Sequence, residues 1–398
     1  STDMVPTDTI GARIKYWRLR RGGMTQGVLA GLAGVDQSFI SKVESGLKGV
    51  ERRSTLVALA RALHVSVADL LGQPGDPTDP LKAEAVAVVP AIRAAIIEIE
   101  EGERRTAELG DEEFAALVER IDALRATSDY GAMAPLTPGF LFDAAARGGI
   151  SLVRAAYEAS VCLRNLGYRD LALPAARVAV AAAQEAEDAA WLGAARFVHT
   201  LAMPIETAAT TARIAERSLA ALQADAADVE VRQMLGQMHL SASMACAVDG
   251  RADDAQAHLA AAHQEARTLG DPADGVGFNL CSFGPTNLSL WRMNVAIELG
   301  EHGEVLDLSK RTNPAPLRMA NRHQTYWMSC GRALAHSGKA DRQALVAFMH
   351  AERAAPLAFS LHPMARDAVA AMVRRARHRS ASDDLRIMAR RLGVHVPV

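Results

Sequence analysis

The stretch GVDQSFISKVESG, residues 34–46, spaces polar and apolar side chains as a binding helix would. If Asp36 caps a helix that runs to Ser45, Ile40 and Val43 lie three residues apart on one face. The opposite face then carries four polar side chains, those of Gln37, Ser38, Ser41 and Lys42. Their amide, hydroxyl and ammonium groups suit base edges and phosphates, although a solvated helix face would look similar. The neighbouring sequence has to decide between these two readings.

Charge is unevenly divided along the 398-residue chain. Residues 1–72 hold ten Lys or Arg against six Asp or Glu, which gives +4. Because the whole chain carries −2, the remainder carries −6. This division favours binding of a polyanion by the first segment alone.

The composition, with 49% hydrophobic residues, allows more than one buried core. We see no run of about 18 apolar residues and no basic-then-apolar signal sequence, so we expect no membrane partner and a cytoplasmic location. The four cysteines are widely separated, at Cys162, Cys246, Cys281 and Cys330. None stands at metal-ligand spacing, so we expect reduced core thiols, no metal and no cofactor.

The boundary between two domains is indicated by GQPGDPTDP at residues 72–80, which has three prolines and two glycines. We therefore expect a first domain at residues 1–72, a linker at 73–80 and a second domain at 81–398. Apolar periodicity in the first domain predicts five short helices, the second of them marked by Val28, Leu29 and Leu32.

The second domain reads almost entirely as helix, with breaks about every 35–45 residues. Small residues, a turn glycine and large residues recur at similar offsets in three segments. These are ASVCLRNLGYRDLALPAARVAVAA, SASMACAVDGRADDAQAHLAAAHQEA and SGKADRQALVAFMHAERAAP. The offsets resemble those of tetratricopeptide (TPR) repeats, which implies an α-solenoid. A non-repeating, alanine-rich helical bundle is the alternative, and either arrangement is all-α.

In the first domain, MTQGVLAGLAGVDQSFISKVESG followed by STLVALARALHVSVADLL resembles the Xre-type helix-turn-helix family, relatives of the lambda-like phage repressors. The resemblance covers residues 9–71 and implies a five-helix DNA-binding domain. Gly34 would supply the turn before the third helix, and Gly46 would follow its end. Two glycines inside the second helix, Gly27 and Gly31, depart from good helix formers.

The same resemblance implies which residues contact DNA. Gln37, Ser38, Ser41 and Lys42 would face the major groove. Phosphate contacts would come from Gln26, Lys48, Arg52 and Arg53. Arg18 and Glu44 resemble the ion pair that joins the first and third helices in this family.

The whole arrangement, an Xre-type head on a TPR-like body, resembles a group of actinobacterial regulators and, in architecture, peptide-pheromone receptors. A concave TPR surface would bind a small-molecule or peptide effector. The candidate residues for that site are Phe283, Asn287, Trp291, Asn294, His323 and Tyr326. The alternative is that these aromatic residues are core and the asparagines cap or bridge helices.

Enzyme motifs are missing from the sequence: it contains no GxxxxGK[ST], GxSxG or HExxH, and no GxGxxG that opens a helix after a strand. We therefore expect no catalytic residues. The expected protein is a homodimeric transcriptional regulator that binds a double-stranded DNA operator and responds to an effector. The rival hypothesis is a TPR interaction scaffold with a vestigial head.

Overall fold

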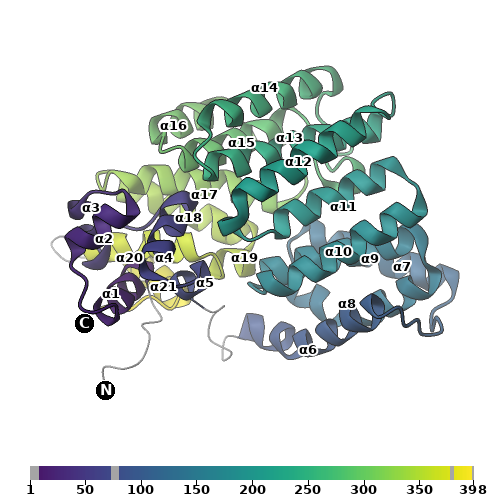
Figure 1. Cartoon of the computed structure of the whole chain (residues 1–398), viewed down its shortest axis with the longest axis horizontal. Helices are drawn as coiled ribbons and strands as arrows, with labels where there is room; N and C mark the ends of the chain where they lie inside the picture. Colours follow the sequence, from purple (N-terminus) through teal and green to yellow (C-terminus); the bar gives the residue numbers. More distant parts are fainter. Residues whose placement is uncertain (1–8, 73–79, 377–380, 397–398) are drawn as a thin grey trace. The chain divides into compact units, whose positions relative to one another are not determined.

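The structure, a computed structural model, describes residues 9–72, 80–376 and 381–396. Within these ranges every regular element is a helix and no strand is present, so the all-α expectation is confirmed (Figure 1). None of the described helices is long and apolar enough to cross a membrane.

Five helices make up the segment that resembles the helix-turn-helix family. They are α1 (Ile10–Arg20), α2 (Gln26–Ala33), α3 (Gln37–Glu44), α4 (Arg53–Leu63) and α5 (Val67–Leu71). The following α-helices are α6 (Pro80–Glu100), α7 (Asp111–Ala126), α8 (Tyr130–Arg147), α9 (Gly149–Asn165), α10 (Arg169–Ala186), α11 (Ala189–Ala202), α12 (Ala208–Gln223), α13 (Val229–Val248), α14 (Ala252–Leu269), α15 (Pro285–Glu298), α16 (His302–Arg311), α17 (Ala320–His336), α18 (Asp341–Ala354), α19 (Pro356–Ser360), α20 (Pro363–Ala376) and α21 (Asp383–Arg391). Two short 3₁₀ helices are η1 (Ile205–Thr207) and η2 (Phe278–Leu280).

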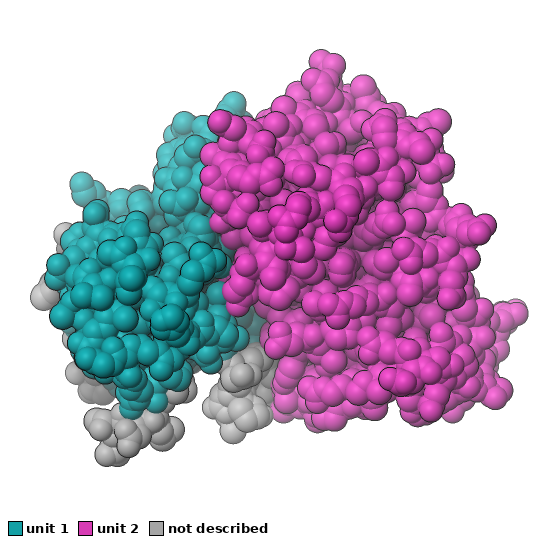
Figure 2. Space-filling view, in the orientation of Figure 1, with its two compact units in different colours: residues 1–75, 293–311, 324–398 teal, residues 76–292, 312–323 magenta. Residues whose placement is uncertain are grey.

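The chain forms two compact units (Figure 2). Unit 1 contains residues 1–75, 293–311 and 324–398, and unit 2 contains residues 76–292 and 312–323. The first five helices therefore share a unit with the C-terminal helices, an association that the expected division into residues 1–72 and 81–398 did not include.

The expected linker, residues 73–80, is described only at its end. Residues 73–79 lie outside the described ranges, and Pro80 is the first residue of α6. Proline suits the first turn of a helix because its missing N–H would have no partner there.

Buried aliphatic side chains hold α1 to α5 together. Ile14 of α1, Ile40 of α3, and Leu56, Leu59 and Leu63 of α4 are all fully buried. The spacing of these residues follows the helical period, which is why the sequence predicts their common face.

The second helix buries less than its apolar residues suggest. Leu29 and Ala30 are buried, whereas Val28 is 52% exposed and Leu32 is 62% exposed. Val28 and Leu32 therefore indicate the helix in the sequence but do not contribute to the core of the domain, because they lie four residues apart on the outer face of the helix.

Glycine permits the close crossing of α1 and α3. A Cβ atom at Gly11 would overlap the carbonyl oxygen of Val43. Two other glycines occupy left-handed backbone conformations at turns, Gly34 with φ +69° and Gly46 with φ +80°. Both turn positions agree with the roles predicted for these glycines.

In unit 2, helices α8 to α14 pack in sequence, each against the next. Two of the three predicted repeat segments form matching hairpins there, α9 with α10 and α13 with α14. Ser160 Oγ donates to the carbonyl of Ala172 at 2.8 Å, and Ser243 Oγ donates to that of Ala255 at 2.9 Å. The same residue type thus makes the same bond across both hairpins, which indicates a repeated structural unit.

The third segment belongs to unit 1, and a glycine of the preceding helix packs against it. A Cβ atom at Gly331 on α17 would come within 2.6 Å of the Phe348 ring on α18. Phe348 is fully buried in a core shared by α17, α18, α20 and α21. A small residue is needed there because the aromatic ring lies directly against the helix.

Candidate DNA-binding surface

The turn between α2 and α3 is formed by local sequence signals. Thr25 caps α2, since its Oγ1 accepts the backbone N–H of Val28 at 3.1 Å. Gly34 then reverses the chain, and α3 follows from Gln37. Asp36 occupies the N-cap position of α3 without a side-chain cap bond, and the helix ends at Glu44, one residue earlier than predicted.

The exposed face of α3 carries the four side chains predicted to face the major groove. Gln37, Ser38, Ser41 and Lys42 are all exposed, and within the described residues none of their side chains has a bonding partner. Gly27 on α2 makes room for this face, because a Cβ atom there would lie 3.3 Å from Gln37 Oε1. The glycine that looked unfavourable within a helix therefore has a packing role.

The opposite face of α3 is firmly held. Ile40 and Val43 are buried. Arg18 on α1 forms a two-bond ion pair with Glu44, with Nε–Oε2 at 2.8 Å and Nη2–Oε1 at 2.7 Å. Its Nη1 also donates to the carbonyl of Met24 at 2.6 Å. The predicted ion pair is thus confirmed, and it fixes α3 against α1 with charge-assisted bonds.

Two of the four residues predicted to contact phosphate lie beside this helix. Gln26, the first residue of α2, is half-buried, and its Nε2 lies 3.4 Å from Glu44 Oε1. Lys48, also half-buried, places Nζ 5.7 Å from the centre of the Phe39 ring. Both residues are close to α3, so both remain candidates for positioning contacts.

The other two, Arg52 and Arg53, adjoin the start of α4, where the structure shows a different partner. Arg52 Nε donates to the carbonyl of Glu298 on α15 at 2.6 Å. The backbone N–H groups of Arg53 and Ser54 donate to the two carboxylate oxygens of Glu298, each at 2.9 Å. Glu298 is 2% exposed. The guanidinium of Arg52 therefore already has a partner within unit 1. A buried carboxylate caps α4 at the place where we had expected a phosphate contact.

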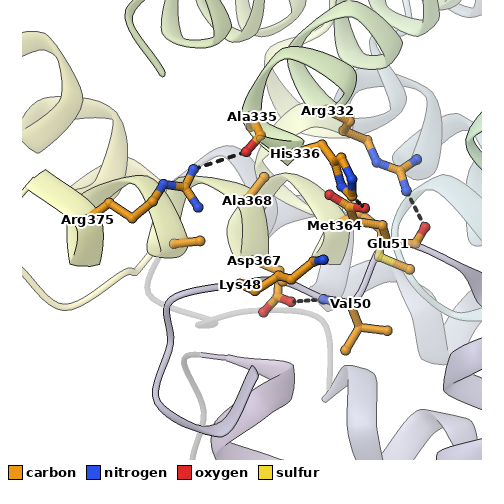
Figure 3. Close-up of a pocket in the computed structure, with 12 residues that line it drawn as sticks. Lys48, Val50, Glu51, Arg332, Ala335, His336, Met364, Asp367, Ala368 and Arg375 are labelled. Atoms are coloured by element: carbon orange, nitrogen blue, oxygen red, sulfur yellow. Dashed lines mark hydrogen bonds and ion pairs between the residues drawn. The ribbon is translucent and has the colours of Figure 1, made fainter. Parts of the chain in front are cut away.

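Further bonds join the first five helices to the C-terminal helices of unit 1 (Figure 3). Asp367 on α20 accepts the N–H of Ile10 at 3.0 Å and that of Val50 at 2.9 Å. Arg332 on α17 donates to the carbonyl of Glu51 at 2.5 Å. Most of these bonds satisfy backbone groups, so they leave no pattern in the local sequence, and sequence reasoning missed them.

Four residues proposed for an effector site belong to unit 2. Phe283 is 1% exposed and lies against Gly236, and Asn287 is fully buried and donates to Gln237 Oε1 at 2.8 Å. These two side chains support the alternative of core packing and helix bridging. Trp291 is half-buried, with its ring centre 6.4 Å from that of Phe197.

The remaining effector candidates are half-buried and also have internal partners. His323 Nε2 lies 2.7 Å from the carbonyl oxygen of Leu317 in unit 2. In unit 1, Tyr326 donates to the carbonyl of Ser309 at 2.9 Å, and Ser329 donates to Asn294 at 3.1 Å. His323, Tyr326 and Asn294 therefore each bond to another segment of their own unit.

Comparison with known families gives one result. Residues 9–71 match the family model of a helix-turn-helix domain. Searches of curated proteins and of solved structures find no match. The matched residues contain α1 to α5, including the turn at Gly34 and the exposed face of α3. Residues 9–71 are therefore a helix-turn-helix domain, a type of domain that binds DNA.

Proposed function

We propose that this protein is a sequence-specific transcriptional regulator of the Xre type and not an enzyme. Its helix-turn-helix domain would read a pseudo-palindromic operator as part of a homodimer, and its TPR-like helices would bind a small-molecule or peptide effector. The observation that carries the proposal is the exposed face of α3, on which Gln37, Ser38, Ser41 and Lys42 have no partner among the described residues.

The chemistry of this face suits base recognition. A glutamine amide can bond to the adenine edge with two hydrogen bonds, and a lysine ammonium can donate to guanine acceptors. Serine hydroxyls can donate or accept. Because Ile40, Val43 and the Arg18–Glu44 pair hold the other face of α3, the reading side chains would be presented from a rigid helix.

Contacts within unit 1 support a connection between an effector and the DNA-binding domain. Glu298 on α15 caps α4, and Asp367 on α20 accepts backbone N–H groups from the first residue of α1 and from Val50, which precedes α4. An effector that favoured a different arrangement of these C-terminal helices would change the environment of the domain. It would do so only if it bound the two arrangements with different affinity.

The rival function is an interaction scaffold whose helix-turn-helix domain no longer reads DNA. Binding of the full chain to a fragment upstream of its own gene, compared with random DNA over a range of salt concentrations, separates the two. A regulator should favour its site at least a thousandfold at physiological salt, within the usual range for specific binding. Equal, weak and steeply salt-dependent binding to both DNAs would favour the scaffold.

A further inference from the structure

Two histidines and a glutamate of unit 1 converge on one point. Glu51 precedes α4, His302 is the first residue of α16, and His336 is the last residue of α17. His336 Nδ1 lies 2.8 Å from Glu51 Oε2, and His302 Nε2 lies 3.0 Å from the same oxygen. The two imidazole rings are stacked, with centres 3.6 Å apart and planes 5° from parallel. Glu51 and His336 are visible in Figure 3.

Hydrogen bonding satisfies only part of this group. His336 Nδ1 and Glu51 Oε2 have hydrogen-bond geometry. His302 Nε2 is close to the same oxygen but outside that geometry, and it is buried without a hydrogen-bond partner among the described residues. A buried polar atom of this kind needs an explanation, and a bound ion is one of the usual ones.

The ligand atoms of the group suit a transition-metal cation. Glu51 offers a carboxylate oxygen and the two histidines offer one ring nitrogen each, and these three atoms all lie within 4.8 Å of one another. The positive charges of Arg332 and Arg53 lie nearby, and the carboxylates of Glu51 and Glu298 partly offset them. One carboxylate and two imidazoles therefore face a common point at which only one hydrogen bond is formed.

We propose that Glu51, His302 and His336 bind a divalent transition-metal ion, for which Zn²⁺ is the best fit. Imidazole nitrogen and carboxylate oxygen are both zinc ligands, and a set of three such ligands leaves a fourth position for water. With metal–ligand bonds of about 2.0–2.1 Å, tetrahedral ligands stand about 3.3 Å apart. The two nitrogens would have to move away from Glu51 Oε2 by only about 0.3–0.5 Å, and one of the stacked rings would have to turn so that both nitrogen lone pairs point at the ion. Mg²⁺ and Ca²⁺ fit less well because they prefer oxygen ligands.

The site would tie the helix-turn-helix domain to the C-terminal helices. Glu51 lies between α3 and α4, whereas the two histidines come from α16 and α17. A bound ion would thus cross-link segments about 250 and 285 residues apart in the chain. This proposal concerns metal binding and holds whether or not the protein recognises an operator.

A second group supplies a matched control. Glu216, Cys246 and His258 also bring possible ligand atoms within 4.8 Å of one another. There, however, Glu216 already pairs with Arg251 at 3.4 Å, and burial raises the pKa of the Cys246 thiol to about 11. A neutral thiol and a paired carboxylate make a poorer ligand set.

The test uses the full chain, freed of metal with a chelator and titrated with Zn²⁺ against a colorimetric competitor. We expect His302→Ala and His336→Ala each to weaken Zn²⁺ binding by at least tenfold, a loss that even outer partners of metal ligands can cause. His258→Ala should bind as the parent does. Zn²⁺ should also raise the melting temperature of the parent and of His258→Ala but not of His302→Ala.

Titration with Co²⁺ gives a readout that does not depend on variants. The parent should show the visible absorption of a four-coordinate Co²⁺ ion without a thiolate charge-transfer band. His302→Gln provides a second variant if His302→Ala does not fold, as judged by circular dichroism. The proposal is overturned if the parent does not bind Zn²⁺ at micromolar concentration, if the His302 variants bind as tightly as the parent, or if a thiolate band shows that a cysteine is a ligand.

Discussion

Some of the residues predicted to contact DNA lie on an exposed helix face, whereas others already bond within the protein. Helical periodicity alone predicts that Gln37 and Lys42 share an exposed face, because that inference needs only the local sequence. The partner of Arg52 is Glu298, 246 residues away in the chain. No local pattern could have indicated that bond, which is why the sequence analysis predicts only a phosphate contact for Arg52.

The Arg18–Glu44 pair yields a stability prediction. Glu44→Ala should leave Arg18, whose side chain is 10% exposed, without its carboxylate partner and should cost about 3–5 kcal/mol of unfolding free energy. Hydrogen exchange of α1 and α3 would measure the loss. Glu98→Ala, which breaks the more exposed pair with Arg105, should have a much smaller effect on its own helix. Equal losses of stability in Glu44→Ala and Glu98→Ala would show that burial does not determine how much the Arg18–Glu44 pair stabilises the fold.

The histidine pair of unit 2 yields a pH prediction. Burial, and then repulsion from His258, lower the pKa of His239 to about 4. In the unfolded chain this histidine takes up its proton near pH 6.5, so stability should fall between pH 6.5 and 4. The contribution is up to about 3 kcal/mol. Urea unfolding of unit 2 should show a weaker pH dependence in His239→Gln than in the parent, and an unchanged dependence would refute the assignment.

Helices and turns are the features that the sequence predicted best. The five helices of the domain and the turns at Gly34 and Gly46 all follow from local signals. The close crossing at Gly11 did not, because its partner is the backbone of Val43 on another helix. The sequence thus indicated the elements, whereas their mutual packing depended on contacts that no local pattern records.

The capping of α4 by α15 yields a prediction about these two elements. Glu298→Ala should leave the N–H groups of Arg53 and Ser54 without their carboxylate and should cost about 1–3 kcal/mol. The exchange of these two amide protons should become faster, as measured by NMR. Glu304→Ala, which removes an exposed carboxylate of α16, is the control and should leave both rates unchanged.

At the level of the whole chain, the division into units departs from the order of the sequence. Most of the expected linker lies outside the described residues, between the end of α5 and the start of α6. The C-terminal helices nevertheless belong to unit 1, because they donate to and accept from backbone groups of the helix-turn-helix domain. Backbone bonding of this kind depends on three-dimensional proximity rather than on residue type.

A dimeric regulator should be sensitive to the spacing of its half-sites. Two domains held by one assembly must meet the DNA about one helical turn apart, roughly 34 Å, or a multiple of it. Insertion of about five base pairs between the half-sites should therefore lower affinity strongly, and insertion of about ten should restore part of it. Gel-shift titration measures both, and analytical ultracentrifugation measures the oligomeric state. Affinity that is independent of spacing would contradict binding as a rigid dimer.

The central claim is that α3 reads bases, and the most direct test compares specific with random DNA for single variants. Gln37→Ala and Lys42→Ala should each lose about 1–3 kcal/mol on the operator and relax its preference at one position, with less change on random DNA. Lys15→Ala, which removes one exposed positive charge from α1, is the control and should leave the ratio of the two affinities unchanged. If Gln37→Ala and Lys42→Ala weaken binding to both DNAs equally, or to neither, α3 does not read the operator.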